Sequence, residues 1–151
     1  MNSLYLFNEE YLDKVTISSK GYITFGGTPD DTNIRSLTYG GPLRTIAPLW
    51  SNHIPDEDSR VYYLESADKF IVQYSNYTQD DLNFQLILFK DGSILFQYLN
   101  GGFSSNFASI GLKGPNYYDG ISVNTGSIRS IVPDEYAVHF TTSKAISYFS
   151  P

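Results

Sequence analysis

The sequence predicts an all-β fold, an antiparallel β-sandwich of two packed sheets with about ten to twelve short strands. Apolar segments of about five to seven residues recur along the chain and are separated by Gly, Pro, Asn and Asp, which are turn residues. Aromatic residues make up 16% of the 151 residues, including 13 Tyr and 10 Phe, and they suit pleated surfaces better than helices. Several neighbouring segments are joined by turns so short that they require antiparallel hairpins.

The expected strands follow the chain in order, and two early hairpins organise the first half. Ser19 to Gly21 closes the first hairpin, and Glu65 to Asp68 closes the second. The strands are expected near Leu4–Phe7, Lys14–Ser18, Tyr22–Phe25, Thr45–Trp50, Val61–Glu65, Lys69–Ser75, Asn83–Lys90, Ser93–Leu99, Ala108–Lys113, Gly120–Asn124, Ala137–Thr141 and Ala145–Phe149.

The strand, turn, strand unit from Phe84 to Leu99 is the strongest local sign of β structure. Asp91-Gly92 can supply the two positive φ angles of a type I′ turn. Alternate residues of the run FQLILF are apolar on both faces, which predicts a central strand covered on both sides or nearly so.

The chain is expected to form a single β-sandwich domain over residues 1–151, excised from a larger secreted or surface protein. The stretches Gly26 to Arg44 and Asn52 to Arg60 are rich in turn residues and are interpreted as loops, since no change of composition borders them. The expected core contains Ile17, Ile23, Phe25, Ile46, Trp50, Phe70, Val72, Phe84, Leu86, Leu88, Ile94, Phe96, Ile110, Leu112, Val123 and Phe140.

Charge and composition weigh against several classes of partner. The net charge of −6 and the scattered 10 Lys and Arg disfavour nucleic acid. No apolar run approaches the roughly 18 to 20 residues that a membrane-spanning helix needs, so no membrane span is expected. The absence of cysteine excludes disulfides and thiolate chemistry. An export signal, where one exists, is expected outside this chain.

No residue pattern predicts catalysis, and the chain is expected not to be an enzyme. The two histidines are His53 in a loop and His139 in a strand, where it is expected to be exposed; neither lies in a nucleophile motif. The acidic groups Asp30-Asp31, Asp56 to Asp58 and Asp80-Asp81 lie in polar turns, which keeps their pKa values ordinary. Asp56 and Asp58 are weak calcium candidates, and no other cofactor is expected.

Tyrosine placement is the remaining functional signal. Many tyrosines lie in loops or at the ends or polar faces of strands, where cross-strand aromatic pairs account for most of them. Tyr117-Tyr118-Asp119, in the loop from Gly114 to Gly120, is the segment most suited to stacking on a ligand. Tyr39 and Tyr77 complete the predicted ligand-binding set, and the expected partner is a glycan or a protein surface.

The order and spacing of several segments resemble the nidogen-like β-sandwich modules of bacterial and archaeal secreted proteases and surface proteins. These segments are SSKGYITFGG (18–27), IAPLW (46–50), VYYLESADKFIVQYSNY (61–77), FQLILFKDGSILFQY (84–98) and ASIGLKGPNYYDGISVN (108–124). Lys20 stands where the family pattern has Asn, and Ser51-Asn52 stands where it has Asp-Asp. The resemblance implies accessory, adhesive or matrix roles.

The predicted function is therefore a non-catalytic binding or adhesion module located outside the cell or at its surface. One alternative is a self-assembling structural subunit of a filament or surface layer that exchanges strands at its chain ends. It is suggested by an N-terminus shorter than the family pattern and by the strand-like tail from Ala145 to Pro151. The second alternative is a jelly-roll hydrolase, which would need clustered carboxylates.

Overall fold

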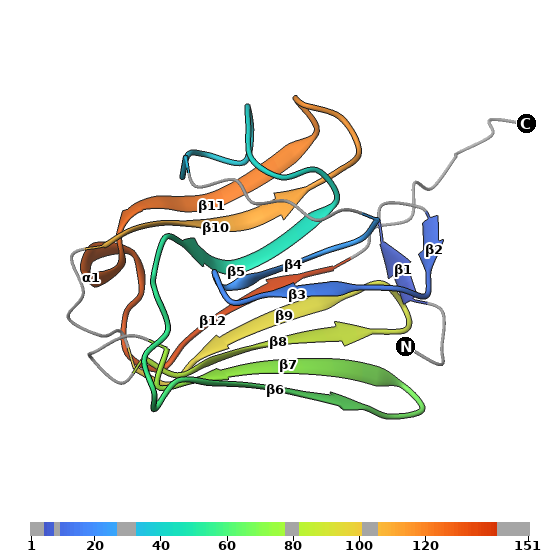
Figure 1. The fold of residues 1–151 in the computed structure, drawn as a ribbon. Helices are drawn as coiled ribbons and strands as arrows, with labels where there is room; N and C mark the ends of the chain where they lie inside the picture. Colours follow the sequence, from blue (N-terminus) through green and yellow to red (C-terminus); the bar gives the residue numbers. More distant parts are fainter. Residues whose placement is uncertain (1–4, 8–9, 27–32, 78–81, 101–105, 142–151) are drawn as a thin grey trace, which may run out of the picture.

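The computed structural model describes residues 5–7, 10–26, 33–77, 82–100 and 106–141. Within these ranges the secondary structure is almost entirely β (Figure 1). The elements are β1 (Tyr5–Phe7), β2 (Glu10–Leu12), β3 (Thr16–Ser18), β4 (Tyr22–Thr24), β5 (Thr45–Ser51), β6 (Arg60–Glu65), β7 (Lys69–Ser75), β8 (Phe84–Phe89), β9 (Ile94–Tyr98), β10 (Phe107–Lys113), β11 (Gly120–Ser127), α1 (Ile128–Ile131) and β12 (Tyr136–Phe140).

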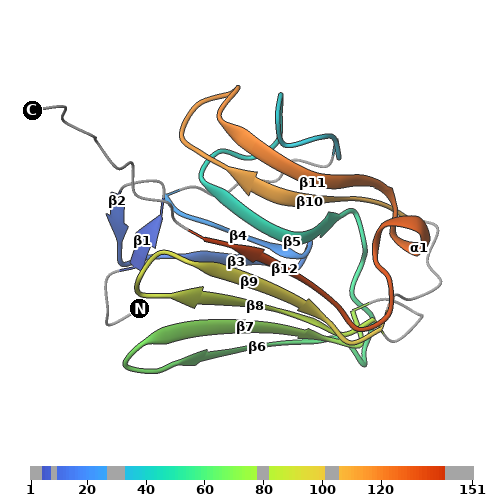
Figure 2. The same ribbon diagram turned by 180° about the vertical axis from the view of Figure 1, so that it is seen from behind.

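Two five-stranded antiparallel sheets pack face to face and confirm the predicted β-sandwich. Sheet I has the strand order β11-β10-β5-β4-β3, and sheet II has the order β12-β9-β8-β7-β6. Figures 1 and 2 show the two sheets as layers from opposite sides. Strands β1 and β2 pair only with each other among the described residues. The sequence did not predict β2 or the short helix α1, and the expected strand Ala145–Phe149 lies outside the described ranges.

The predicted core lies mainly between the two sheets. Twelve of the predicted core residues are buried, and Ile17, Leu112, Val123 and Phe140 are half-buried against them. The principal cluster also contains three tyrosines, Tyr74, Tyr77 and Tyr98. Tyrosine rings therefore supply part of the apolar packing between the two sheets.

Trp50 is buried, as predicted, but it belongs to a second cluster with Tyr22, Leu37 and Ala47. Ile46 faces the intersheet core while Ala47 lies on the opposite face of sheet I. A register shift in the β10–β5 pairing between Ala47 and Trp50 interrupts this alternation, so that Leu49 faces the core and Trp50 lies on the same face as Ala47. The rings of Tyr22 and Trp50 meet edge to face, with centroids 6.3 Å apart. Leu37, from the segment between β4 and β5, helps to cover this face, so every residue of β5 is buried.

The β8–β9 hairpin is confirmed, but its predicted type I′ turn is wrong. Gly92 has φ 88°, whereas Asp91 is not among the residues with positive φ. The Gly92 N–H donates to the Phe89 carbonyl at 3.0 Å, and the Phe89 N–H donates to the Ser93 carbonyl at 3.0 Å. This is a three-residue loop that ends in a left-handed glycine. Asp91 accepts bonds from the N–H and hydroxyl of Ser93, at 2.8 and 2.6 Å.

Strand β8 is central in sheet II, as predicted, yet its outer face is only partly covered. Gln85 and Phe89 on that face are half-buried, while Ile87 is buried. Strand β5 is the strand enclosed on both faces. In the described part of the chain, no helix has the length and apolar character needed to cross a membrane.

Candidate binding surface

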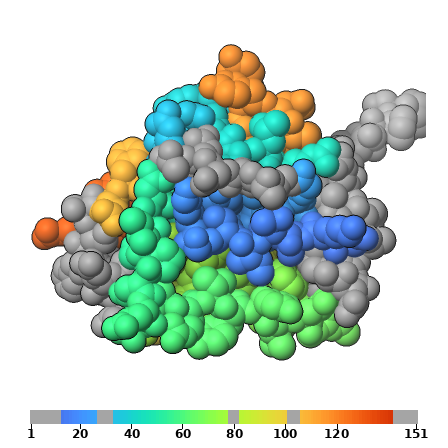
Figure 3. Space-filling model, in the orientation of Figure 1, coloured from blue at the N-terminus to red at the C-terminus, as the bar shows by residue number. Residues whose placement is uncertain are grey.

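The connection between β10 and β11 presents two tyrosine rings to solvent. Tyr117 is 50% exposed and Tyr118 is 81% exposed. Their ring centroids lie 4.9 Å apart and their planes are inclined by 81°, so the two rings form an edge-to-face pair. Figure 3 shows the orange atoms of this connection projecting at the top of the molecule, beside the cyan segment that precedes β5. We call residues 114–119 the tyrosine loop.

Lys113, the last residue of β10, anchors the tyrosine loop through hydrogen bonds from its side chain. Its side chain is fully buried, and its ammonium group donates to the Leu37 carbonyl at 2.9 Å and to the Tyr117 carbonyl. The same nitrogen lies 5.3 Å from the centroid of the Tyr117 ring. A cation in this position can attract both carbonyl dipoles and the face of the ring.

Burial lowers the pKa of Lys113. Asp119 opposes this effect because its negative charge favours the ammonium form, while Arg35 adds to the lowering. The cation is therefore held by carbonyl oxygens, an aromatic face and a nearby carboxylate, and together these interactions fix the loop in one place.

Backbone hydrogen bonds close the tyrosine loop on itself and onto the neighbouring segment. The Gly114 N–H donates to the Asp119 carbonyl at 2.6 Å, and the Asp119 N–H donates to the Asn116 carbonyl at 3.1 Å. The Arg44 N–H donates to the Gly114 carbonyl at 2.9 Å. The predicted residues Tyr117, Tyr118 and Asp119 therefore belong to one braced turn.

Tyr39 lies in the segment between β4 and β5, which a hydrogen bond from Lys113 links to the tyrosine loop. It is 53% exposed, and it stands two residues after Leu37, whose carbonyl accepts the Lys113 bond. Through the Lys113 bonds, the segment that carries this tyrosine is therefore joined to the tyrosine loop.

Tyr77 does not belong to this surface, and its prediction as an exposed contact residue is wrong. Its ring is 2% exposed and meets the rings of Tyr74, Phe84 and His53 at centroid distances of 5.4, 5.0 and 4.8 Å. Its hydroxyl lies 3.3 Å from the Ser51 hydroxyl, and burial raises the pKa of the phenol well above its usual value. The polar tip is satisfied inside the sandwich, so the ring can be enclosed.

Asp56 has a structural role in the turn before β6. One of its carboxylate oxygens accepts bonds from the Asp58 N–H at 3.0 Å and from the Ser59 N–H and hydroxyl, both at 2.9 Å. These bonds, that of the Ser59 hydroxyl first, lower the pKa of Asp56. Asp58 is exposed. Over the described ranges no group of three or more His, Cys, Asp or Glu side chains could hold a metal ion.

The histidines differ in environment. His139 is exposed, as predicted, while His53 is only 8% exposed. Burial lowers the pKa of His53, and nearby Asp56 partly opposes that effect. Its imidazole packs on Tyr77, which gives it a place in the core rather than in an open groove.

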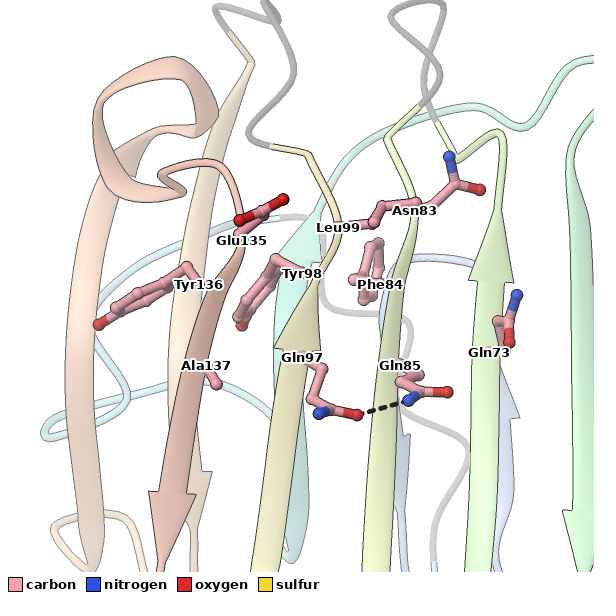
Figure 4. Close-up of a pocket in the computed structure, with 10 residues that line it drawn as sticks. All are labelled: Gln73, Asn83, Phe84, Gln85, Gln97, Tyr98, Leu99, Glu135, Tyr136 and Ala137. Carbon is pink, nitrogen blue, oxygen red and sulfur yellow. Dashed lines mark hydrogen bonds between the residues drawn. The ribbon is translucent and has the colours of Figure 1, made fainter.

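A groove on the outer face of sheet II is a feature that sequence reasoning missed. Gln73, Gln85 and Gln97 lie opposite one another on β7, β8 and β9, and the Gln85 amide donates to the Gln97 carbonyl at 2.5 Å (Figure 4). The groove encloses about 520 Å³, and Asn83 and Glu135 also line it. Its amides offer both donors and acceptors to a polar ligand.

The two packed antiparallel sheets place this protein among the β-sandwich proteins. The chain belongs to the family described as NIDO related, whose sequence pattern matches residues 5–149. This match confirms the resemblance to nidogen-like modules. No curated protein and no solved structure gives a significant match to the chain.

Proposed function

We propose that this protein is a non-catalytic extracellular module that binds a glycan or a protein surface through the tyrosine loop. The observation that carries the proposal is the Tyr117–Tyr118 pair, two exposed rings on a loop whose base is fixed by the buried Lys113. Tyr39 extends this surface along the neighbouring segment.

A braced aromatic pair suits binding for two physical reasons. Tyrosine rings bring a large contact area with few rotatable bonds, so ordering them on a ligand costs little entropy. The carbonyl bonds from Lys113 fix the loop before any ligand arrives, which lowers the entropic cost further. A sugar can stack on the 81% exposed ring of Tyr118, and a protein partner can enclose the same ring as a central contact.

The proposed lack of catalysis rests on where the titratable groups lie. His53 is buried against an aromatic ring, and Asp56 is used to close a turn. The polar groove of sheet II, lined by glutamines, is better suited to holding hydroxyl groups of a glycan than to moving protons. In the glycan version of the proposal, this groove is therefore a second contact surface.

Replacing Tyr118 by alanine is expected to weaken ligand binding tenfold or more, which corresponds to about 1.4 kcal/mol. The wild-type chain and the variant are compared on a glycan array at millimolar ligand and on a panel of purified extracellular proteins. Phe107→Ala is the matched control, because Phe107 is 50% exposed at the opposite end of β10. A blank array contradicts the glycan version, and equal loss in both variants contradicts the tyrosine loop as the contact surface.

Replacing Lys113 by methionine is expected to lower the free energy of unfolding by about 1 to 3 kcal/mol, because two carbonyls lose their donor. The variant should also weaken binding, since the tyrosine rings lose their fixed position. Urea denaturation measures the loss of stability, hydrogen exchange at residues 114–119 measures the loss of order in the tyrosine loop, and the glycan array and protein panel measure binding. Unchanged exchange in the tyrosine loop would show that Lys113 does not position it.

A further inference from the structure

Strand β6 is an edge of sheet II and carries exposed apolar side chains along its length. The exposed fractions of its four central residues are 41% for Val61, 56% for Tyr62, 70% for Tyr63 and 59% for Leu64. Figures 1 and 2 show no described element beyond β6 on that side of the sheet. The run VYYL is thus apolar on both faces, although it lies at the rim of the molecule.

The backbone of β6 has hydrogen-bonding groups directed away from β7. The Ser66 N–H donates to the Lys69 carbonyl at 2.9 Å, just beyond the last paired residues of the β6–β7 ladder. Because alternate residues of an antiparallel ladder bond to one neighbour, Leu64 and Tyr62 bond towards β7. The backbone groups of Val61 and Tyr63 therefore point outward from the sheet. The Lys90 N–H bond to the Asp68 carbonyl, 3.1 Å, fits the same alternation on the β8 side.

Most sheet edges in proteins carry a feature that prevents pairing with another chain, such as a lysine, a proline, a bulge or a very short strand. Strand β6 has six residues, pairs with β7 without a register shift, and contains neither lysine nor proline. By contrast, the edge strand β3 of sheet I has only three residues, and the β10–β11 pairing is interrupted by a register shift. The other edge of sheet II, β12, exposes only Ala137 and His139, so β6 is the edge whose exposed apolar residues best suit it to accept a strand.

We infer that β6 pairs with β6 of a second copy of this chain, so that sheet II continues across a twofold axis. The axis passes beside Tyr62, which faces the second copy's Tyr62. Val61 then faces the second copy's Tyr63, and the outward N–H and carbonyl groups of Val61 and Tyr63 bond to their counterparts. This register places tyrosine against tyrosine and valine against tyrosine, pairs that stabilise neighbouring strands.

The charges at the ends of β6 are compatible with a second copy in antiparallel orientation. The strand begins with Arg60 and ends with Glu65, and the residues between them are uncharged. In the proposed register Arg60 faces the second copy's Leu64, and Glu65 faces the second copy's Ser59, so no like charges oppose each other across the axis. A parallel arrangement would bring like charges together.

The first test measures the mass of the wild-type chain by sedimentation and light scattering from about 1 µM to about 1 mM. The mass is expected to rise from 17.0 kDa to twice that value and to stop there, because a twofold contact closes on itself. Tyr62→Lys places two cations across the axis and is expected to weaken association at least tenfold. Tyr118→Lys is the matched control, since it makes the same change on the tyrosine loop and should leave association intact.

Three results would overturn the inference. The first is a wild-type mass of 17.0 kDa at every concentration. The second is an association that Tyr62→Lys leaves unchanged, and the third is an association that Tyr118→Lys reduces as much as Tyr62→Lys does. Because Tyr62 is more than half exposed, its replacement should not prevent folding, which far-ultraviolet circular dichroism checks.

The second test uses disulfide formation and does not depend on the lysine variant. The chain has no cysteine, so Tyr62→Cys introduces a single thiol beside the proposed axis. Opposed residues of an antiparallel pair have Cα atoms about 4.5 to 5.5 Å apart, within reach of a disulfide. Covalent dimer should form at least tenfold faster in Tyr62→Cys than in Tyr118→Cys. Equal rates overturn the inference, and faster dimerisation of Tyr63→Cys than of Tyr62→Cys overturns the register.

Discussion

Replacing Gly21 by alanine is expected to lower the free energy of unfolding by about 3 to 5 kcal/mol, enough to unfold much of a marginally stable domain. Gly21 closes the β3–β4 hairpin with φ 81°, where an L side chain is strained. An added Cβ would lie 2.0 Å from the Leu49 carbonyl oxygen and 2.9 Å from the Tyr77 hydroxyl. Urea denaturation followed by tryptophan fluorescence measures the change, because the single Trp50 is buried near this hairpin.

The clash at Gly21 cannot be relieved by a small shift, because the same backbone joins two strands. The Leu49 N–H donates to the Gly21 carbonyl at 3.0 Å, and the Ser51 N–H donates to the Lys20 carbonyl at 3.0 Å. Moving Leu49 away from Gly21 would stretch both hydrogen bonds. It would also displace Trp50, which lies between Leu49 and Ser51 in β5.

Gly26→Ala is the matched control for Gly21→Ala. Gly26 also has φ 81°, but among the described residues the nearest atom to an added Cβ is the Arg44 guanidinium nitrogen at 4.0 Å. The conformational strain alone should cost about 1 kcal/mol. Equal losses in the two variants would show that strain, not the contact with Leu49, sets the cost at Gly21.

The fold could be predicted because its strongest signals are local. The hairpins around Gly21 and Asp91 each join two apolar segments through a few turn residues, and proximity along the chain then determines the pairing. Alternation along each strand identified the residues that face the core. The packing of Leu37 on Trp50 could not be predicted in this way, because Leu37 lies in a segment without a periodic apolar pattern.

The type of turn at Asp91 determines whether the glutamine groove on sheet II can be predicted. A two-residue turn at Asp91-Gly92 would shift the register of the hairpin by one residue and place Gln85 opposite Tyr98. The observed three-residue loop is symmetric about Asp91 and places Gln85 opposite Gln97. Only this register brings the glutamines of three strands into one row, so the groove could not be predicted from a type I′ turn.

The exposure of some tyrosines depends on neighbouring residues in the sequence, whereas that of others depends on contacts with distant segments. Tyr117 and Tyr118 lie in a polar loop, and the sequence around them was enough to predict exposed rings. Tyr77 has similar polar neighbours along the chain, but contacts with Ser51 and His53, more than twenty residues away, enclose it. The anchoring role of Lys113 also depends on a distant group, the Leu37 carbonyl.

The buried tyrosines predict a steep loss of stability at alkaline pH. Burial raises the pKa of Tyr74, Tyr77 and Tyr98 above that of a free phenol. The folded chain keeps these phenols protonated, whereas the unfolded chain releases their protons near pH 10. Their contribution is therefore fully present below about pH 10 and is lost as the pH rises toward the raised pKa values.

Above pH 10 each such phenol lowers the free energy of unfolding by about 1.4 kcal/mol per pH unit, so three together give about 4 kcal/mol per unit. Absorbance at 295 nm should show Tyr74, Tyr77 and Tyr98 ionising in one cooperative step that coincides with loss of the circular dichroism of the sheets. Tyr77→Phe removes one of the three phenols and should reduce the slope by about a third. Its hydroxyl has only a 3.3 Å contact with Ser51, so this variant should still fold at neutral pH. A smooth titration of all tyrosines with the sheets intact would contradict the burial of these three phenols.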